Sequence, residues 1–131
     1  MDHTLKKVLR LSSDDYYTTH LNLMNCILPV KMTPREIEVM AAFMSLEGDI
    51  ALYRFGPSAK KIVMKRLNLS PAGLSNFMGT LLGKGFLIQK GDAITIYPML
   101  NLQPNEQIYM FKLINYNETN HEQITTTAHT A

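Results

Sequence analysis

The stretch RLNLSPAGLSNFMGTLLGKGFL, residues 66–87, contains the clearest structural signals in this chain. Ser70 can cap a helix whose first position is Pro71, because the hydroxyl accepts a free backbone N–H at a point where proline needs none. An apolar stripe follows at helical spacing, formed by Leu74, Phe77, Met78 and Leu81. Gly85 can adopt the positive φ that ends a helix, so that Phe86 packs back on Leu81. The stretch predicts a helix that starts after Ser70 and ends at Gly85.

Two further elements flank this helix. Before it, GPSAKKIVMKRLN has Pro57 near its start and an apolar side, with Lys61 and Lys65 four residues apart on the exposed side, which predicts a short amphipathic helix. After it, FLIQKGDAITIYP contains two short apolar runs around Gly91 and Asp92, a pair of residues suited to a hairpin turn. A turn at 68–70 joins the two helices.

An earlier helix is predicted by MTPREIEVMAAFMSL. Thr33 and Glu36 form a capping box around Pro34. Apolar side chains fall on both sides of this helix, which predicts that it is buried on both sides. Its cover is expected from both ends of the chain, where the runs 6–12, 20–28 and 108–115 have the short, partly alternating pattern of strands.

The predicted organisation is therefore one α+β domain with additions. Residues 1–31 are expected to be an N-terminal β extension, residues 32–98 the helical domain with its hairpin, and residues 99–131 a C-terminal strand and a polar tail. A length of 131 residues, 46% apolar and 18% charged, is that of a globular protein with one hydrophobic core.

Charge, apolar runs and cysteine content indicate where in the cell the protein is expected. The net charge is only +2, but positive charge is concentrated between residues 33 and 97. No signal peptide opens the chain and no apolar run approaches the length of a membrane span, so we expect a cytoplasmic protein without membrane contact. The single cysteine, Cys26, lies among apolar residues and is expected to be buried.

From Met32 to about Pro98 the sequence resembles the winged helix-turn-helix family, on the segments LNLSPAGLSNFMGTLLGKGFL and QKGDAI. A looser resemblance connects it to small uncharacterised bacteriophage proteins, which would place it in a virion. The winged-helix resemblance implies that the helix after Ser70 enters the major groove of double-stranded DNA. It implies two sets of contacts. The residues nearest the bases or phosphates would be Ser70, Ser75, Asn76 and Thr80. The phosphate contacts would come from Arg54, Lys60, Lys61, Lys65, Lys84 and Lys90.

The same helix has a second feature that favours another partner. Its outer face carries no arginine or lysine but small residues, Ala72, Gly79 and Gly83, which let a second backbone approach closely. Protein packing is therefore the alternative to DNA binding: a structural or assembly protein, for example a virion component, would use this face and the terminal extensions to dock on protein neighbours.

Catalytic chemistry has little support in the sequence. The histidines are far apart, no His, Cys or carboxylate group has metal-site spacing, and neither a phosphate-binding loop nor a nucleophile elbow is present. We therefore expect no enzyme activity, no metal and no cofactor. The leading hypothesis is a small DNA-binding transcriptional regulator that forms a homo-oligomer.

Overall fold

The computed structural model describes residues 4–117 and shows an α+β protein with five α-helices and one two-stranded antiparallel sheet in that range. The chain divides after Leu100 into two units, and these helices and strands all lie in the first. The elements are α1 (Ser13–Asn25), α2 (Pro34–Met44), α3 (Asp49–Leu52), α4 (Pro57–Leu67), α5 (Pro71–Gly83), β1 (Leu87–Lys90), β2 (Ala93–Ile96) and the 3-10 helix η1 (Pro98–Leu100).

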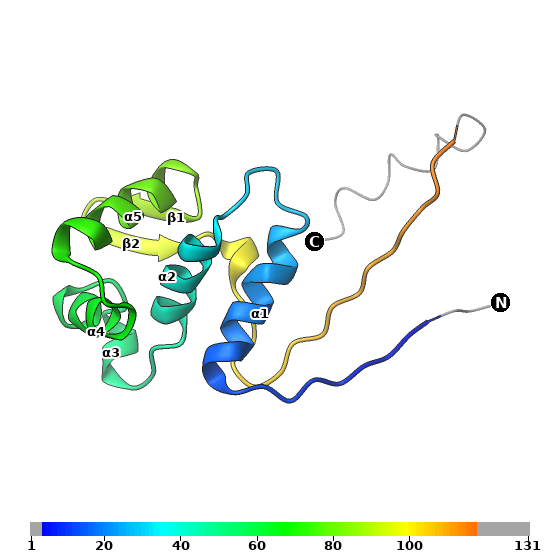
Figure 1. Ribbon diagram of the computed structural model, residues 1–131, viewed down its shortest axis with the longest axis horizontal. Helices are drawn as coiled ribbons and strands as arrows, with labels where there is room; N and C mark the ends of the chain where they lie inside the picture. The colour runs from blue at the N-terminus through cyan, green and yellow to red at the C-terminus, as the bar shows by residue number, and fades with distance from the viewer. Residues whose placement is uncertain (1–3, 118–131) are drawn as a thin grey trace. The chain divides into compact units, whose positions relative to one another are not determined.

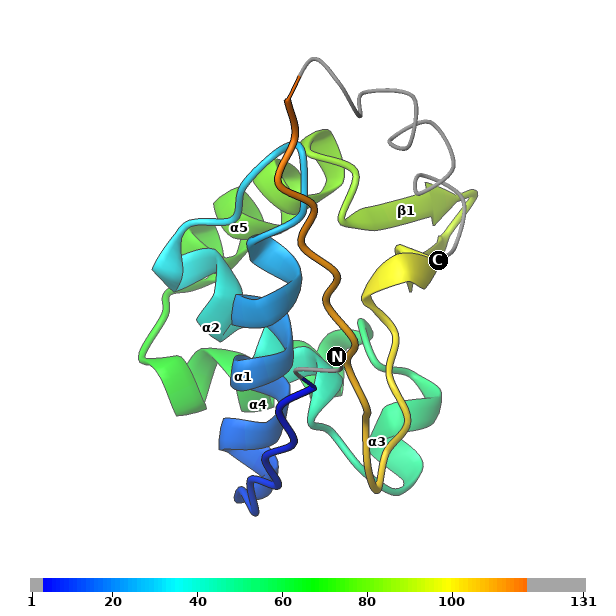
Figure 2. The same ribbon diagram turned by 90° about the vertical axis from the view of Figure 1, so that its right-hand side faces the viewer.

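Helix α2 is the centre of the first unit. It lies between α1 on one side and α4 and α5 on the other (Figure 1, Figure 2). Val39, Met40 and Phe43 are completely buried along it. The capping box is present, because Thr33 accepts the Glu36 backbone N–H and the Glu36 carboxylate accepts the Thr33 backbone N–H. The prediction of a helix buried on two sides is confirmed.

The cover on its second side is a helix, not the sheet that the sequence pattern suggested. Most of the run 20–28 belongs to α1, and residues 4–12 and 101–117 contain no strand. The expected terminal sheet is therefore wrong. The physical reason lies upstream of the run: the Ser12 hydroxyl accepts the Asp15 backbone N–H, and Asp14 and Asp15 place negative charge in the first turn, where the helix dipole favours it. His20 and Leu21 then face the core.

The ends of α4 and α5 follow the sequence prediction closely. Ser70 accepts the Gly73 backbone N–H at 3.0 Å and begins α5. Gly85 has φ +83°, and the N–H groups of Gly85 and Phe86 donate to the carbonyls of Leu82 and Leu81. These two bonds define a Schellman motif, in which the left-handed residue needs no Cβ. Asn68, with φ 54°, ends α4 in the same left-handed conformation.

The hairpin is also as predicted. Strands β1 and β2 pair antiparallel with Lys90 opposite Ala93, which leaves Gly91 and Asp92 as a two-residue turn. Gly91 supplies the positive φ, +61°, at the first turn position. The hairpin packs against α5 through β1, where Leu87 is buried. The chain then returns through η1, whose Leu100 is buried in the core.

Three smaller expectations concern Cys26, membrane-spanning helices and the polar tail. Cys26 is exposed at the end of α1, so the expectation of a buried thiol is wrong; its neighbour along the turn, Leu28, enters the core instead. Of the helices within residues 4–117, none combines the length and the apolar character needed to cross a bilayer. The expected polar tail falls mostly in residues 118–131, which lie outside the described residues.

Candidate functional site

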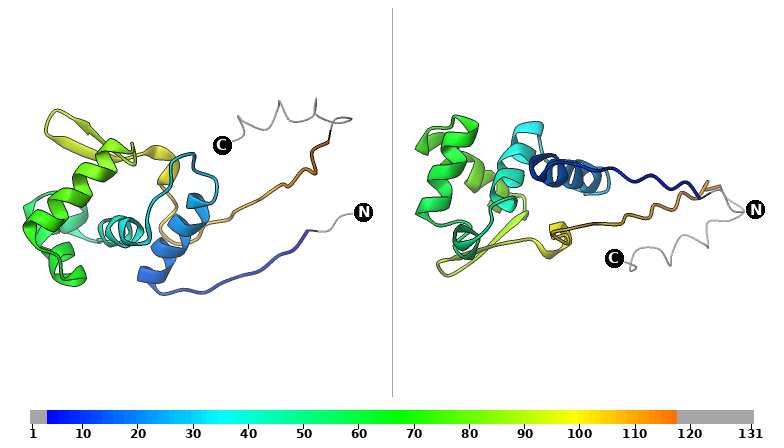
Figure 3. Two further views of the ribbon diagram at one scale, coloured as in Figure 1. Left: turned by 45° about the horizontal axis from the view of Figure 1, so that its top comes forward. Right: turned by 90° about the horizontal axis from the view of Figure 1, so that it is seen from below.

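The outer face of α5 is open. Its inner side is buried through Leu74, Met78 and Leu81, while the opposite side carries six exposed residues. These are Ala72, Ser75, Asn76, Gly79, Thr80 and Gly83. A Cβ added at Gly79 or Gly83 would meet no described atom within 4 Å. Figure 3 shows α5 at the outside of the first unit, with the hairpin beside it. The chain's own described residues therefore leave this face available to a partner.

The polar groups on this face differ in how free they are. The Ser70 hydroxyl accepts a bond from the α5 backbone, and Thr80 Oγ1 donates to the Asn76 carbonyl at 3.0 Å. The side chains of Ser75 and Asn76 are exposed and have no hydrogen-bond partner within residues 4–117. The Asn76 carboxamide, with two donors and an acceptor, is thus the most versatile hydrogen-bonding group that α5 presents.

Four of the six expected cations remain available. Lys61 and Lys65 are exposed on α4, Lys60 is half-buried beside them, and Lys90 is exposed next to the hairpin turn. None of these side chains makes a hydrogen bond or ion pair with the described part of the chain. Because α4 and α5 pack on each other, the α4 lysines belong to the same helix pair as the open face.

The other two expected cations are used inside the fold. Arg54 Nη1 donates to the carbonyls of Phe43 at 2.7 Å, Met44 at 2.9 Å and Leu46 at 3.2 Å, so this guanidinium satisfies the C-terminal end of α2. Lys84 Nζ lies 2.7 Å from Glu36 Oε1 and 3.0 Å from the carbonyl of Lys31. Arg54 and Lys84 thus have partners within the fold, unlike the four lysines above.

The Glu36 carboxylate shows how tightly Lys84 is engaged. Burial would raise the pKa of Glu36, but hydrogen bonds from Lys84 and from the Thr33 backbone, together with the charge of Lys84, outweigh burial and lower it. The ionised form is favoured because the carboxylate accepts hydrogen bonds from the Thr33 backbone N–H and from Lys84 Nζ. The pair joins the start of α2 to the end of α5 and holds these two helices together.

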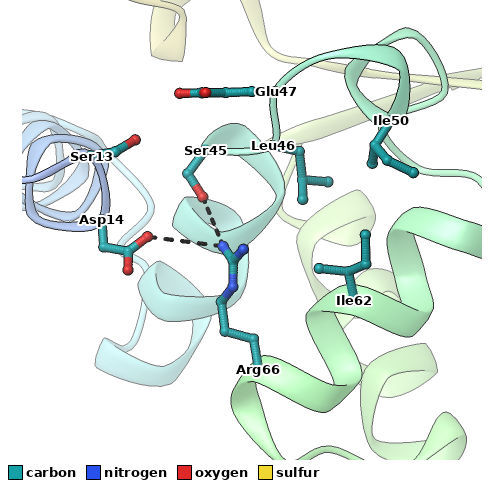
Figure 4. A pocket seen from close by; sticks show the side chains of 8 residues that line it. All are labelled: Ser13, Asp14, Ser45, Leu46, Glu47, Ile50, Ile62 and Arg66. Atoms are coloured by element: carbon teal, nitrogen blue, oxygen red, sulfur yellow. Dashed lines mark hydrogen bonds and ion pairs between the residues drawn. The ribbon is translucent and has the colours of Figure 1, made fainter.

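A pocket of about 380 Å³ lies on another part of the first unit, where α1, α3 and α4 meet the end of α2 (Figure 4). Arg66 Nη1 contacts Ser45 Oγ at 3.2 Å and Asp14 Oδ1 at 3.9 Å on one side of it. Apolar side chains form the other side. The lining residues are Ser13, Asp14, Ser45, Leu46, Glu47, Ile50, Ile62 and Arg66. Sequence reasoning missed this pocket because its walls come from four separate segments.

Comparison of the sequence with protein-family models, and of the chain with curated proteins and solved structures, found no match. Within residues 4–117, no three His, Cys, Asp or Glu side chains gather as metal ligands would. The case for a function therefore depends on the α5 face, the lysines near it and the pocket.

Proposed function

We propose that residues 32–98 form a winged helix-turn-helix domain that binds double-stranded DNA without catalysis, as a small transcriptional regulator of the cytoplasm. The observation that carries the proposal is the uncovered outer face of α5, with its exposed Asn76 and open glycine positions. The element order supports it, because α2, α4 and α5 are followed directly by a two-stranded hairpin, as in the family that the sequence resembles.

The chemistry of the face defines how DNA would be bound. Lys60, Lys61, Lys65 and Lys90 are free to contact phosphates, which supply most of the affinity in such complexes. Asn76 can form two hydrogen bonds with an adenine edge. Because α5 presents no arginine to guanine, recognition depends mainly on DNA shape, and Gly79 and Gly83 allow the sugar-phosphate backbone to come close.

The test is an electrophoretic shift assay with duplex DNA at two salt concentrations. Four phosphate contacts predict an affinity loss of about a hundredfold between 50 and 200 mM salt. Lys61→Glu with Lys65→Glu should abolish binding, whereas Lys112→Glu, which reverses an exposed charge outside residues 32–98, should leave it almost unchanged. An affinity for DNA that changes neither with salt concentration nor with the Lys61 and Lys65 substitutions would overturn the proposal.

A second candidate function is assembly with protein neighbours, for instance in a phage virion. Two observations favour it: the α5 face is uncharged, and Ile108, Met110 and Leu113 are between 81% and 95% exposed. This function predicts little affinity for DNA and a large oligomer that Gly79→Leu disrupts. Since a Cβ at Gly79 has no neighbouring side chain or other element of the described residues within 4 Å, the variant should fold normally. Circular dichroism checks that it is folded, and light scattering of that sample then decides between the two functions.

A further inference from the structure

Residues 4–12 form an N-terminal arm, TLKKVLRLS, without helix or strand. Its apolar side chains are uncovered: Leu5 is 95% exposed, Val8 71% and Leu9 60%. Between them stand Lys6, Lys7 and Arg10, and the arm has no acidic residue. A segment that combines exposed aliphatic side chains with charge of one sign has the composition of an interaction surface.

The pocket beside Arg66 has the opposite character. Leu46, Ile50 and Ile62 converge on one side of it, and Glu47 lies above Ser45 in the view of Figure 4 and also lines the pocket. Asp14 lies on the other side, where it faces the guanidinium of Arg66. The pocket thus has one apolar side, and its edge carries two carboxylates, Asp14 and Glu47, against the one guanidinium of Arg66, in contrast to the basic, apolar arm.

We propose that the pocket of one copy of this protein receives the N-terminal arm of a second copy. Leu5, Val8 or Leu9 would enter the apolar side of the pocket, while Lys6 and Lys7 meet the acidic edge. A pocket of about 380 Å³ holds a few side chains, so it anchors the arm rather than enclosing it. Charge complementarity sets the orientation and the apolar side chains provide most of the stability.

The position of the arm makes the exchange mutual. The arm joins the first unit at Ser12, and the next two residues, Ser13 and Asp14, already line the pocket. Donor and acceptor therefore lie at the same place on the surface. Two copies related by a two-fold axis near that place can each give an arm and accept one, which closes the assembly as a dimer. Nine extended residues span about 30 Å, enough to cross such an interface.

Dimerisation can be measured by analytical ultracentrifugation of the full chain at low salt and without DNA, so that its failure is distinguishable from failure of DNA binding. Glu47→Lys should weaken the dimer about tenfold, and Lys6→Glu with Lys7→Glu should do the same. All three changes together should restore it to within about threefold of the parent, because the charges again match. Charge changes that act additively, with no rescue, would overturn the proposal.

A mixing experiment identifies whose arm fills the pocket. One variant, Leu5→Ser with Val8→Ser and Leu9→Ser, keeps its pocket but loses its apolar arm; another, Ile62→Lys, keeps its arm but loses its pocket. Each alone should be monomeric, and the mixture should form mixed dimers through the single intact pair. A mixture that stays monomeric contradicts the exchange, as does a serine variant that dimerises like the parent. Thermal unfolding of Ile62→Lys, followed by circular dichroism, checks that it is folded; if it is not, Ile50→Lys, at another apolar residue of the same side of the pocket, takes its place.

Discussion

At the scale of single residues, positive charges of the same type have unrelated roles. Lys84 and Arg54 are bound to carboxylate or carbonyl oxygens within the fold, while Lys61 and Lys65 have no partner among residues 4–117. The distinction depends on what each side chain can reach, since all four occur in the same basic middle of the sequence. Substitution of Lys84 or Arg54 should therefore alter the stability of the fold, whereas substitution of Lys61 or Lys65 should alter binding.

Lys84→Met should destabilise the protein by about 1–3 kcal/mol, because it leaves the buried Glu36 carboxylate without its countercharge. The variant should also be less sensitive to acid than the parent, so that the stability difference between the two shrinks as the pH falls. The lowered pKa of Glu36 contributes stability that is present above its ordinary value of 4.5 and is lost as the pH falls through the folded-state pKa; without Lys84 that contribution disappears. Urea unfolding at pH 7 and pH 4 measures both effects.

The matched control for this variant is Lys65→Met. It removes the same charge from an exposed position without a described partner, so the free energy of unfolding should change by less than about 0.5 kcal/mol. If Lys65→Met costs as much as Lys84→Met, the ion pair with Glu36 contributes nothing specific to stability.

His20 should make stability depend on pH in a higher range. Its ring is buried and Nε2 donates to the Leu100 carbonyl at 2.6 Å. Burial lowers the pKa of His20 below 6.5, more than the backbone hydrogen bond raises it. The unfolded chain therefore binds more protons than the native protein below about pH 6.5, and the free energy of unfolding should fall as the pH falls from 7.5 to 5. Replacement by Gln should flatten this part of the profile in urea titrations; an unchanged slope would rule His20 out as its source.

At the scale of elements, substitution of a glycine inside α5 and of the glycine that follows the helix should have opposite effects on stability. Gly79→Ala should stabilise the protein by about 0.5–1 kcal/mol, because alanine favours the helix and its Cβ meets open space. Gly85→Ala should destabilise it by about 1 kcal/mol, because φ of +83° is unfavourable for a residue with a Cβ. Thermal unfolding compares the two directly. A gain at both positions would mean that α5 does not end at a left-handed residue.

The elements that sequence reasoning found are those with local chemical signals. Caps at Thr33 and Ser70, the glycine at 85 and the turn at Gly91 each act over a few residues, so the sequence predicts them and the structure confirms them. Helix α1 was missed because HLNLMNCIL alternates like a strand, while its decisive signal, the cap at Ser12 followed by two aspartates, precedes the run.

The candidate site was predicted less completely, for a different reason. The exposed residues of α5 follow from helical periodicity alone once the buried stripe is known. The engagement of Lys84 with Glu36 joins residues 48 positions apart, and Arg54 reaches back to the end of an earlier helix. Such contacts depend on how the helices pack, which no local pattern encodes. The pocket around Arg66 escaped prediction for the same reason.

At the scale of the whole molecule, the fully buried side chains of the described residues all lie between Leu21 and Leu100. A chain that ends after Leu102 should therefore fold cooperatively, with a single thermal transition. A chain that ends after Tyr97 should lose several kcal/mol, because it lacks the buried Leu100 and the acceptor for His20. Equal stability of the two truncations would show that η1 is not part of the core.

The bond between His20 and Leu100 has one more consequence, for the moment of synthesis. It joins the first helix to the last buried residue, 80 positions later. While the ribosome is still making the β1–β2 hairpin, the His20 ring of α1 has no carbonyl to donate to, and the nascent core lacks the side chain of Leu100. The first helix to emerge therefore receives its last hydrogen-bonding partner only when residue 100 has been made, and until then a chaperone that recognises apolar segments has access to it.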